Sequence, residues 1–462
     1  MHSEAEAPKP APPANIIYGL EDAPPPLARF FVALQHLLAI FVSIITAPLL
    51  ICLGMGLDPL ETSYMISSAL VISGGATFIQ VRKFGVVGAG MLTIQGTSFT
   101  FIGPLIFAYT MLGDRYTSDE ILGIVFGCTL VGAVMMMILS QFLHKLQRIV
   151  TPTVTGTAVI MLGLSLVMVT VHNLLRVHRE AVAAGEPVWL VSAYALGVVA
   201  LIGFFATRRA PWCRLASVSI GLALGYLVAL LSGGIDFSPM AELPAYFVPR
   251  PLAYGLGFEW AVFLSLLPIY LVTAAESIGD LTATSSLSGL PVSGPRYWQR
   301  VRDGVLGDGV NSVLAALFTT FPNTTFSQNN GVIRLTGVAS RSVGIWLAAM
   351  LVVMGLFPVL GGLFQVMPKG LLYGATLLMF ALVGYSGVQI IVAAGGGRRA
   401  WGIAGGATLI GLLAVPLPDL IPDMSPMLAM LLGFPVSTST VAAIVLELAW
   451  PRGDIVEVAD AG

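Results

Sequence analysis

Long apolar stretches recur along the whole chain, separated by short polar connections. Many of them exceed about 18 residues, the length that crosses the hydrocarbon core of a bilayer as a helix. We delimit fourteen segments, at 28–53, 62–80, 86–110, 121–143, 151–173, 189–206, 212–232, 258–283, 303–320, 326–340, 343–366, 370–394, 400–418 and 422–449. The pattern therefore predicts an all-α polytopic membrane protein with fourteen transmembrane segments.

Two of these segments are interrupted. The third contains Gly88, Gly90, Gly96, Gly103 and Pro104, and the tenth is short and opens with the polar run TTFSQNN. If fourteen segments divide into seven and seven, the interrupted segments hold the same position in each half. Seven is odd, so the second half would enter from the opposite side as an inverted repeat. Paired interrupted segments of this kind indicate a transporter binding site.

Composition narrows the class of protein. Hydrophobic residues make up 56% of the chain and charged residues 10%, with a net charge of −2. This balance excludes a soluble globule and a nucleic-acid binder that acts through a basic patch. The three cysteines are far apart and form no metal-binding or disulfide pattern. We expect no metal site and no cofactor, apart from a possible coupling proton.

Orientation follows from the positions of Lys and Arg in the connections. Most of them fall in the even-numbered connections, whereas the odd-numbered ones carry Arg115, Arg176, Arg179, Arg250 and Lys369. The even connections are then cytoplasmic, and so are both termini. The first residues are rich in Pro and Ala without an apolar run, so we interpret them as a flexible tail rather than a signal peptide.

Ionisable residues within the segments are costly and therefore candidates for function. Glu276 and Asp280 stand four residues apart in the eighth segment, on one helical face. A carboxyl group in such a place can carry a proton, or it can pair with an arginine. Asp308 in the ninth segment suits a proton path or a structural hydrogen bond, and His36 in the first suits either a functional role or a bond to a neighbouring helix.

The tenth segment contains groups that can form hydrogen bonds with the edge of a ligand. A short helix starting near Ser327 would direct free N–H groups into the membrane. Gln328 offers one acceptor and two donors, and Phe99 in the third segment offers a ring face. Together with Glu276, these groups fit a flat heterocycle with adjacent N–H and C=O groups. We expect Arg334 to lie near the cytoplasmic end of its segment or to pair with a carboxylate.

These motifs resemble the nucleobase–ascorbate transporters, also called nucleobase:cation symporters. The family signature [Q/E/P]-N-x-G-x-x-x-x-T-[R/K/G] is filled by the run from Gln328 to Gly337. QHLLAIF, AESIGDLTAT and DGVNSVLAALF resemble family motifs in the same order, and the resemblance runs from about Tyr18 to about Leu448.

The resemblance implies a seven-plus-seven inverted repeat with short β-strands in segments three and ten. It implies a core domain from 28–143 and 253–367 and a gate domain from 144–252 and 368–450. Cytoplasmic tails would cover 1–27 and 451–462. The gate domains would form a homodimer.

The resemblance also implies roles for individual residues. Glu276 and Gln328 would bind the base through their side chains, Phe99 and Ser327 through ring or backbone, and Ser98 would tune substrate preference. Four further residues match positions tied to proton coupling or to the hydrogen-bond network of the site: His36, Asp280, Asp308 and Asn329.

At two positions the chain resembles the purine branch of the family. Uracil-type members carry Glu where Gln328 stands and His where Asp280 stands. Ser98 replaces the Asn of some xanthine carriers, and Asn323 resembles urate carriers. The choice between urate and xanthine stays open at this point, as does the meaning of Arg334.

The predicted function is proton-coupled import of a purine base, urate or xanthine, across the cell (inner) membrane. We expect the protein to contact membrane lipid and to bind no nucleic acid. An inorganic-anion exchanger of the same architecture is the main alternative, but Glu276 would repel an anion. A channel is a further alternative. An enzyme is not expected, because no nucleophile–base pair or metal cluster is present in the segments.

Overall fold

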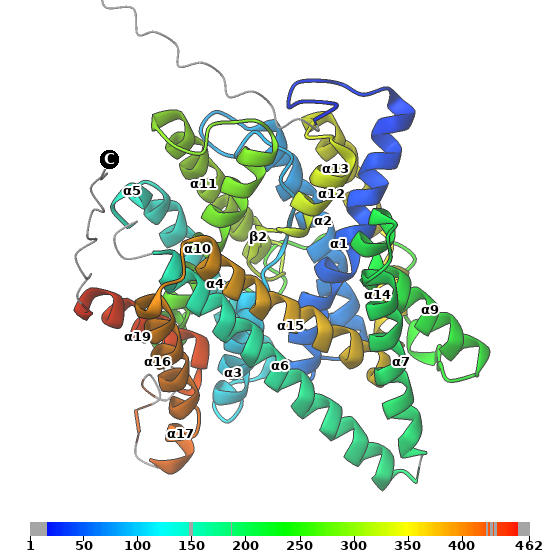
Figure 1. Ribbon diagram of the computed structural model, residues 1–462. Helices are drawn as coiled ribbons and strands as arrows, with labels where there is room; N and C mark the ends of the chain where they lie inside the picture. Colours follow the sequence, from blue (N-terminus) through cyan, green and yellow to red (C-terminus); the bar gives the residue numbers. More distant parts are fainter. Residues whose placement is uncertain are drawn as a thin grey trace, which may run out of the picture.

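The computed structural model describes residues 16–146, 151–185, 187–421, 424–425, 428 and 432–450. Nearly all of its regular structure is helical (Figure 1). The α-helices are α1 (Pro26–Met55), α2 (Pro59–Arg82), α3 (Ile102–Leu112), α4 (Ser118–Ser140), α5 (Leu143–Leu146), α6 (Pro152–Ala183), α7 (Val188–Ala206), α8 (Pro211–Leu215), α9 (Ser217–Leu231), α10 (Trp260–Leu287), α11 (Pro295–Leu317), α12 (Gln328–Thr336), α13 (Arg341–Gly355), α14 (Val359–Gln365), α15 (Lys369–Ala393), α16 (Arg398–Ala414), α17 (Leu417–Leu420) and α19 (Pro435–Ala449). The remaining elements are the strands β1 (Gln95–Thr97) and β2 (Asn323–Thr325) and the 3-10 helices η1 (Phe99–Phe101) and η2 (Ser238–Met240).

Seven helices within the described ranges are long and apolar enough to cross a membrane, namely α1, α2, α4, α6, α7, α10 and α15. The pair α13 and α14, bent by 74°, would make an eighth crossing if it forms one span. The prediction of a mostly helical, multi-pass membrane protein is confirmed. The count of fourteen crossings remains a prediction. Several of the predicted segments contain helices that are too short or too polar to be identified as membrane crossings by length and composition alone. For example, Asp303 and Asp308 lie within α11.

Local sequence sets the helix ends. Asp58 accepts a hydrogen bond from Glu61 N at 2.8 Å and caps α2. Thr117 and Glu120 form a reciprocal capping box at the start of α4. Gly56 adopts φ 74° after α1, a left-handed conformation that stops the helix at little steric cost.

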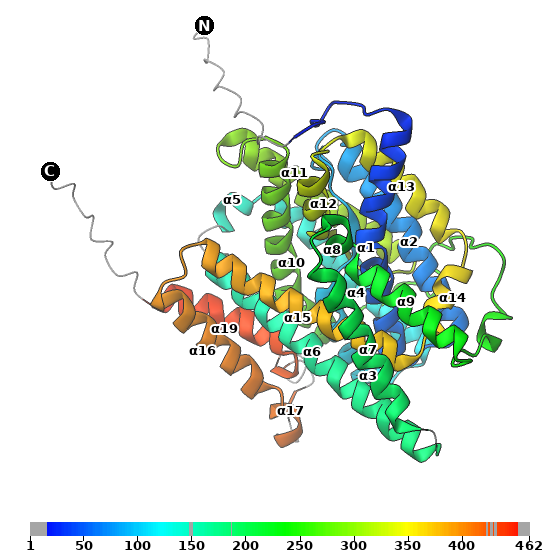
Figure 2. The ribbon, with the colours of Figure 1, turned by 45° about the vertical axis from the view of Figure 1, so that its right-hand side comes forward.

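The helices pack in two groups (Figures 1 and 2). One group contains α6, α7, α15, α16 and α19, and α6 lies along α15 in both views. The backbones of these two helices approach closely because both carry glycine at the crossing. A Cβ atom on Gly163 of α6 would lie 2.2 Å from Gly384 N of α15. Small residues at such crossings are typical of helix packing in membranes.

The second group contains α1, α2, α4, α10, α11 and α13, and the two strands lie within it. β1 and β2 pair antiparallel, with Gln95 opposite Thr325 and Thr97 opposite Asn323. β1 lies between α2 and α3 in the chain, and β2 lies between α11 and α12. The two expected strands are present. β1 lies within the third predicted segment, whereas β2 ends just before the predicted start of the tenth at residue 326, and their pairing brings the two interrupted segments together.

Candidate functional site

The strand pair positions two helix starts side by side. Backbone pairing continues beyond the strands, because Ser98 N donates to Pro322 O and Phe326 N donates to Ile94 O, both at 2.9 Å. η1 and α3 follow β1, and α12 follows β2 after Ser327. The predicted residues Ser98, Phe99, Ser327 and Gln328 therefore lie at the ends of two paired strands.

An aromatic stack lines this place. The rings of Phe99 and Phe326 are parallel within 5°, with centroids 5.9 Å apart. Phe380 of α15 meets the Phe99 ring edge-on at 5.6 Å. Gly96 leaves room for the stack, since a Cβ atom there would lie 2.7 Å from the Phe326 ring. The sequence pattern assigned no role to Phe326, although this residue stands in the polar run TTFSQNN. Phe380 was missed because an apolar ring in an apolar segment carries no distinguishing signal.

Glu276 of α10 is tied to the start of η1. Its Oε2 accepts a hydrogen bond from Thr100 Oγ1 at 3.1 Å, whereas Oε1 has no hydrogen-bond partner within the described part of the chain. Glu276 and Gln328 are both half-buried, and Ser327 is exposed. The carboxylate is thus oriented through one oxygen, and the other oxygen can accept a further hydrogen bond.

α10 also contacts α12 directly. Thr284 Oγ1, two turns beyond Glu276, donates to Asn330 Oδ1 at 2.7 Å. The half-buried Asp280 lies between these two contacts on the same helix. Over the described ranges, no hydrogen bond or ion pair involves the Asp280 carboxylate. The alternative of a salt bridge to an arginine is not realised there for Glu276 either.

Asp308 of α11 is the centre of a fully buried hydrogen-bond network. Gln80 Nε2 donates to its Oδ1 at 2.6 Å, Ser277 Oγ donates to its Oδ2, and Thr325 Oγ1 lies 3.3 Å from Oδ2. Gln80 is itself fixed, because its Oε1 accepts from Ala89 N at 2.8 Å. Asp308 therefore joins α2, α10 and β2 through neutral partners.

His36 and Asn329 lie together where α1 meets α12. Both are buried, and the imidazole lies beside the Asn329 side chain. Asn329 Nδ2 also donates to Leu92 O, just before β1. Asn329 therefore links the helix after β2 to the segment before β1.

Of the other residues singled out in the sequence, Ser98 and Asn323 are buried and Arg334 is exposed. Ser98 is fully buried, and its hydroxyl accepts from Thr100 N at 3.3 Å as the cap of η1. Asn323 is fully buried in β2. Arg334 is exposed on the last turn of α12.

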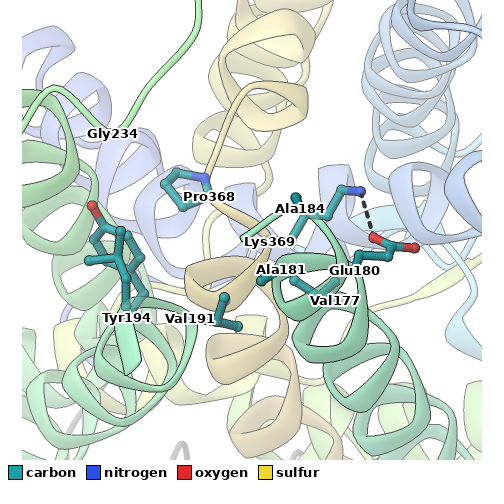
Figure 3. Close-up of a pocket in the computed structure, with 11 residues that line it drawn as sticks. Val177, Glu180, Ala181, Ala184, Val191, Tyr194, Gly234, Pro368 and Lys369 are labelled. Atoms are coloured by element: carbon teal, nitrogen blue, oxygen red, sulfur yellow. Dashed lines mark ion pairs between the residues drawn. The ribbon is translucent and has the colours of Figure 1, made fainter. Parts of the chain in front are cut away.

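A separate cavity of about 390 Å³ lies between the end of α6, the start of α7 and the start of α15 (Figure 3). Glu180 and Lys369 form an ion pair in it at 3.6 Å. None of the predicted site residues lines this cavity. In the described ranges, no group of three or more His, Cys, Asp or Glu residues could hold a metal ion.

The fold is similar to that of solved membrane proteins. The transmembrane domain of the cyanobacterial bicarbonate transporter BicA matches with a TM-score of 0.55 at 15% identity, over 91% of this chain and 96% of that chain. SLC26A9 matches with a TM-score of 0.56 at 9% identity, over 91% of this chain and 65% of that chain. At these identities the likeness establishes the fold alone.

Sequence relatives identify the family. The model of the permease family Xan_ur_permease matches residues 27–420. Xanthine permease XanP of Escherichia coli K12 is 42% identical over 444 residues, 95% of each chain. XanQ of the same strain is 37% identical over 446 residues, and the uric acid-xanthine permease of Emericella nidulans is 29% identical over 445 residues, covering 90% of this chain and 78% of its own.

The chain therefore belongs to the nucleobase–ascorbate transporter family, as its motifs predicted. It is a permease and not an enzyme.

Proposed function

We propose that this protein imports a purine base, xanthine or urate, in symport with protons. The observation that carries the proposal is the Glu276 carboxylate. Thr100, the residue that follows Phe99 of the aromatic stack, donates to one of its oxygens, and the other oxygen has no hydrogen-bond partner among the described residues. The names of the relatives support the substrate class, since two are xanthine permeases and one is a uric acid-xanthine permease.

The substrate would lie flat between the aromatic stack and α10. A ring N–H would donate to Glu276 Oε1, and the Gln328 amide would match an adjacent N–H and C=O pair on the base edge. Phe99 would contact the ring face, and Ser327 would contribute a backbone group at the start of α12. Ser98 would act indirectly, by setting the direction of η1.

Proton coupling would use Asp280 and Asp308, the two carboxylates that are not proposed to bind the base. Asp308 joins three elements of the site and has no cation beside it among the described residues, and Asp280 lies one turn from Glu276. A proton bound on either carboxylate would neutralise a buried charge as the protein changes conformation. His36 and Asn329 would transmit the change between α1 and the strand pair.

Alternating access would follow from two domains of an inverted repeat with fourteen crossings. The core would comprise 28–143 and 253–367, and the gate would comprise 144–252 and 368–450. The separate packing of the α6–α15 group and the strand-containing group supports this division, as does the equivalent place of β1 and β2 after α2 and α11. Phe380 would be the gate residue that covers the substrate beside Phe99.

Three further features belong to the same proposal. The gate domains would form a homodimer, the protein would lie in the inner membrane, and both termini would be cytoplasmic. The excess of Lys and Arg in the even connections supports the orientation.

Uptake of radiolabelled xanthine and urate by cells without purine carriers tests the function. We expect saturable uptake of at least one base, no uptake of uracil, and loss of accumulation with a protonophore. Exchange of bicarbonate or chloride without purine uptake would contradict the proposal and favour an anion exchanger. Accumulation unaffected by the protonophore would reject proton coupling alone.

A further inference from the structure

Polar side chains gather on the back of the strand pair, on the face turned toward α2 and α11. Residues opposite each other in antiparallel strands direct their side chains to the same face, so Thr97 and Asn323 point together. Gln95 and Thr325 share that face, and Gln95 Nε2 donates to Thr325 Oγ1 at 3.0 Å. Asn311 Nδ2 of α11 lies 3.4 Å from Gln95 Oε1. This face therefore meets α11.

The course of the chain along α2 places Ser73 next to this face. The chain after α2 folds back along that helix, from contacts at Gln80 to a hydrogen bond from Gln95 N to Thr77 Oγ1 at 3.0 Å. Two residues further on, the same direction brings Thr97 toward Ser73, which lies one helical turn before Thr77. α2 and β1 pack together along this line.

Five polar atoms of these side chains have no hydrogen-bond partner among the described residues. They are Ser73 Oγ, Thr97 Oγ1, Asn311 Oδ1 and both Nδ2 and Oδ1 of Asn323. All four residues are 0% exposed. Folded proteins satisfy nearly all buried polar atoms, either with protein groups or with ordered water. Five such atoms from four elements therefore indicate a bound ligand.

We infer that these four residues, the strand-back cluster, bind ordered water molecules. The cluster offers a free amide donor and a free amide acceptor at Asn323, a carbonyl acceptor at Asn311, and two hydroxyls that can do either. Water donates and accepts, so it matches this mixed set. A cation would face the amide hydrogens of Asn323, and an anion would find no positive charge in the cluster.

The bound waters connect the substrate strands to the buried network. Thr97 directly precedes Ser98, and Asn323 begins the strand that leads to Gln328. Asp308 is joined to the cluster through Thr325 and Gln95. The waters therefore hold β1 and β2 against α2 and α11, behind the residues that the proposed function assigns to the base.

Thermal unfolding of the purified full chain in detergent tests the inference. Thr97→Val and Asn323→Leu remove polar atoms while keeping most of the side-chain volume. If water is bound, each variant loses hydrogen bonds to it, and the unfolding midpoint falls by about 1–2 °C or more. If the cluster is dry, removing an unpartnered polar atom leaves the midpoint unchanged or raises it, which would overturn the inference.

A matched control and a coupling measurement sharpen the test. Ser165 on α6 is a single buried hydroxyl without a partner among the described residues, and it lies outside the cluster, so Ser165→Ala removes one isolated hydroxyl and should lower the midpoint less than Thr97→Val does. Thr97 and Asn323 share water, so the shift of the double variant should be smaller than the sum of the single shifts. Additive shifts would contradict shared water.

Exchange of sodium for choline in the same assay separates water from a cation. We expect the midpoint of the unmodified protein to be the same in both salts. A rise in sodium that Asn323→Leu abolishes would identify the ligand as a cation and overturn the assignment of water. These measurements require no transport, so they stand independently of the proposed substrate.

Discussion

Thr100 donates a hydrogen bond from Oγ1 to Oε2 of Glu276 at 3.1 Å, and this bond joins the start of η1 to the middle of α10. The two residues are 176 positions apart in the chain. The bond fixes one carboxylate oxygen, and the other has no hydrogen-bond partner within the ranges that the structure describes. Thr100 is therefore a positioning residue for the proposed substrate ligand.

Thr100→Val should raise the KM for purine uptake about tenfold, because Glu276 loses the charged hydrogen bond that orients it. Thr100→Ser keeps the hydroxyl and should restore most of the affinity. Radiolabelled uptake, normalised to the amount of protein in the membrane, measures both. Thr100→Val with an unchanged KM would show that the hydrogen bond does not position the ligand.

Gly96→Ala should weaken substrate affinity without preventing insertion into the membrane. The new Cβ would lie 2.7 Å from the Phe326 ring, so the ring must move and its stack on Phe99 is disturbed. Gly75→Ala in the neighbouring α2 is the control, since its Cβ would meet nothing within 4 Å. Competition by unlabelled xanthine gives the affinities, and equal values for the two variants would count against the stack.

Asp308→Asn should abolish accumulation while leaving equilibrium binding of the base within about threefold. Asp308 accepts hydrogen bonds behind the strands, and an amide cannot carry the coupling proton. Uptake against a gradient and binding to purified protein separate the two effects. The exposed Asp236→Asn serves as control. A variant that still concentrates substrate would transfer the coupling role to Asp280.

Gly163→Ala should destabilise the protein by about 1–3 kcal/mol through overpacking, because the added Cβ would lie 2.2 Å from Gly384 N across the α6–α15 crossing. Gly197→Ala on α7, where a Cβ would meet nothing within 4 Å, should be neutral or stabilising. Thermal unfolding in detergent compares them. Equal midpoints would mean that the two helices can separate freely at this point.

Much of the site could be predicted from the sequence because its signals are local. A spacing of four placed Glu276 and Asp280 on one face of a helix, and glycines with a polar run marked the two interrupted segments. The contacts of Thr100 and Gln80 could not be predicted, because each joins segments more than 170 residues apart. The role of Phe380 could not be predicted either, since any phenylalanine of an apolar helix can face lipid, a neighbouring helix or a ligand.

Equilibrium binding of radiolabelled xanthine and urate to purified Glu276→Gln tests the central claim most directly. The unmodified protein should bind at least one of the two bases. Glu276→Gln should bind it at least tenfold more weakly, since a charged acceptor is lost opposite a buried ring N–H, whereas the exposed control Glu242→Gln should bind as the unmodified protein does. Glu276→Gln that binds purine with unchanged affinity would contradict the assignment of this carboxylate as the substrate ligand.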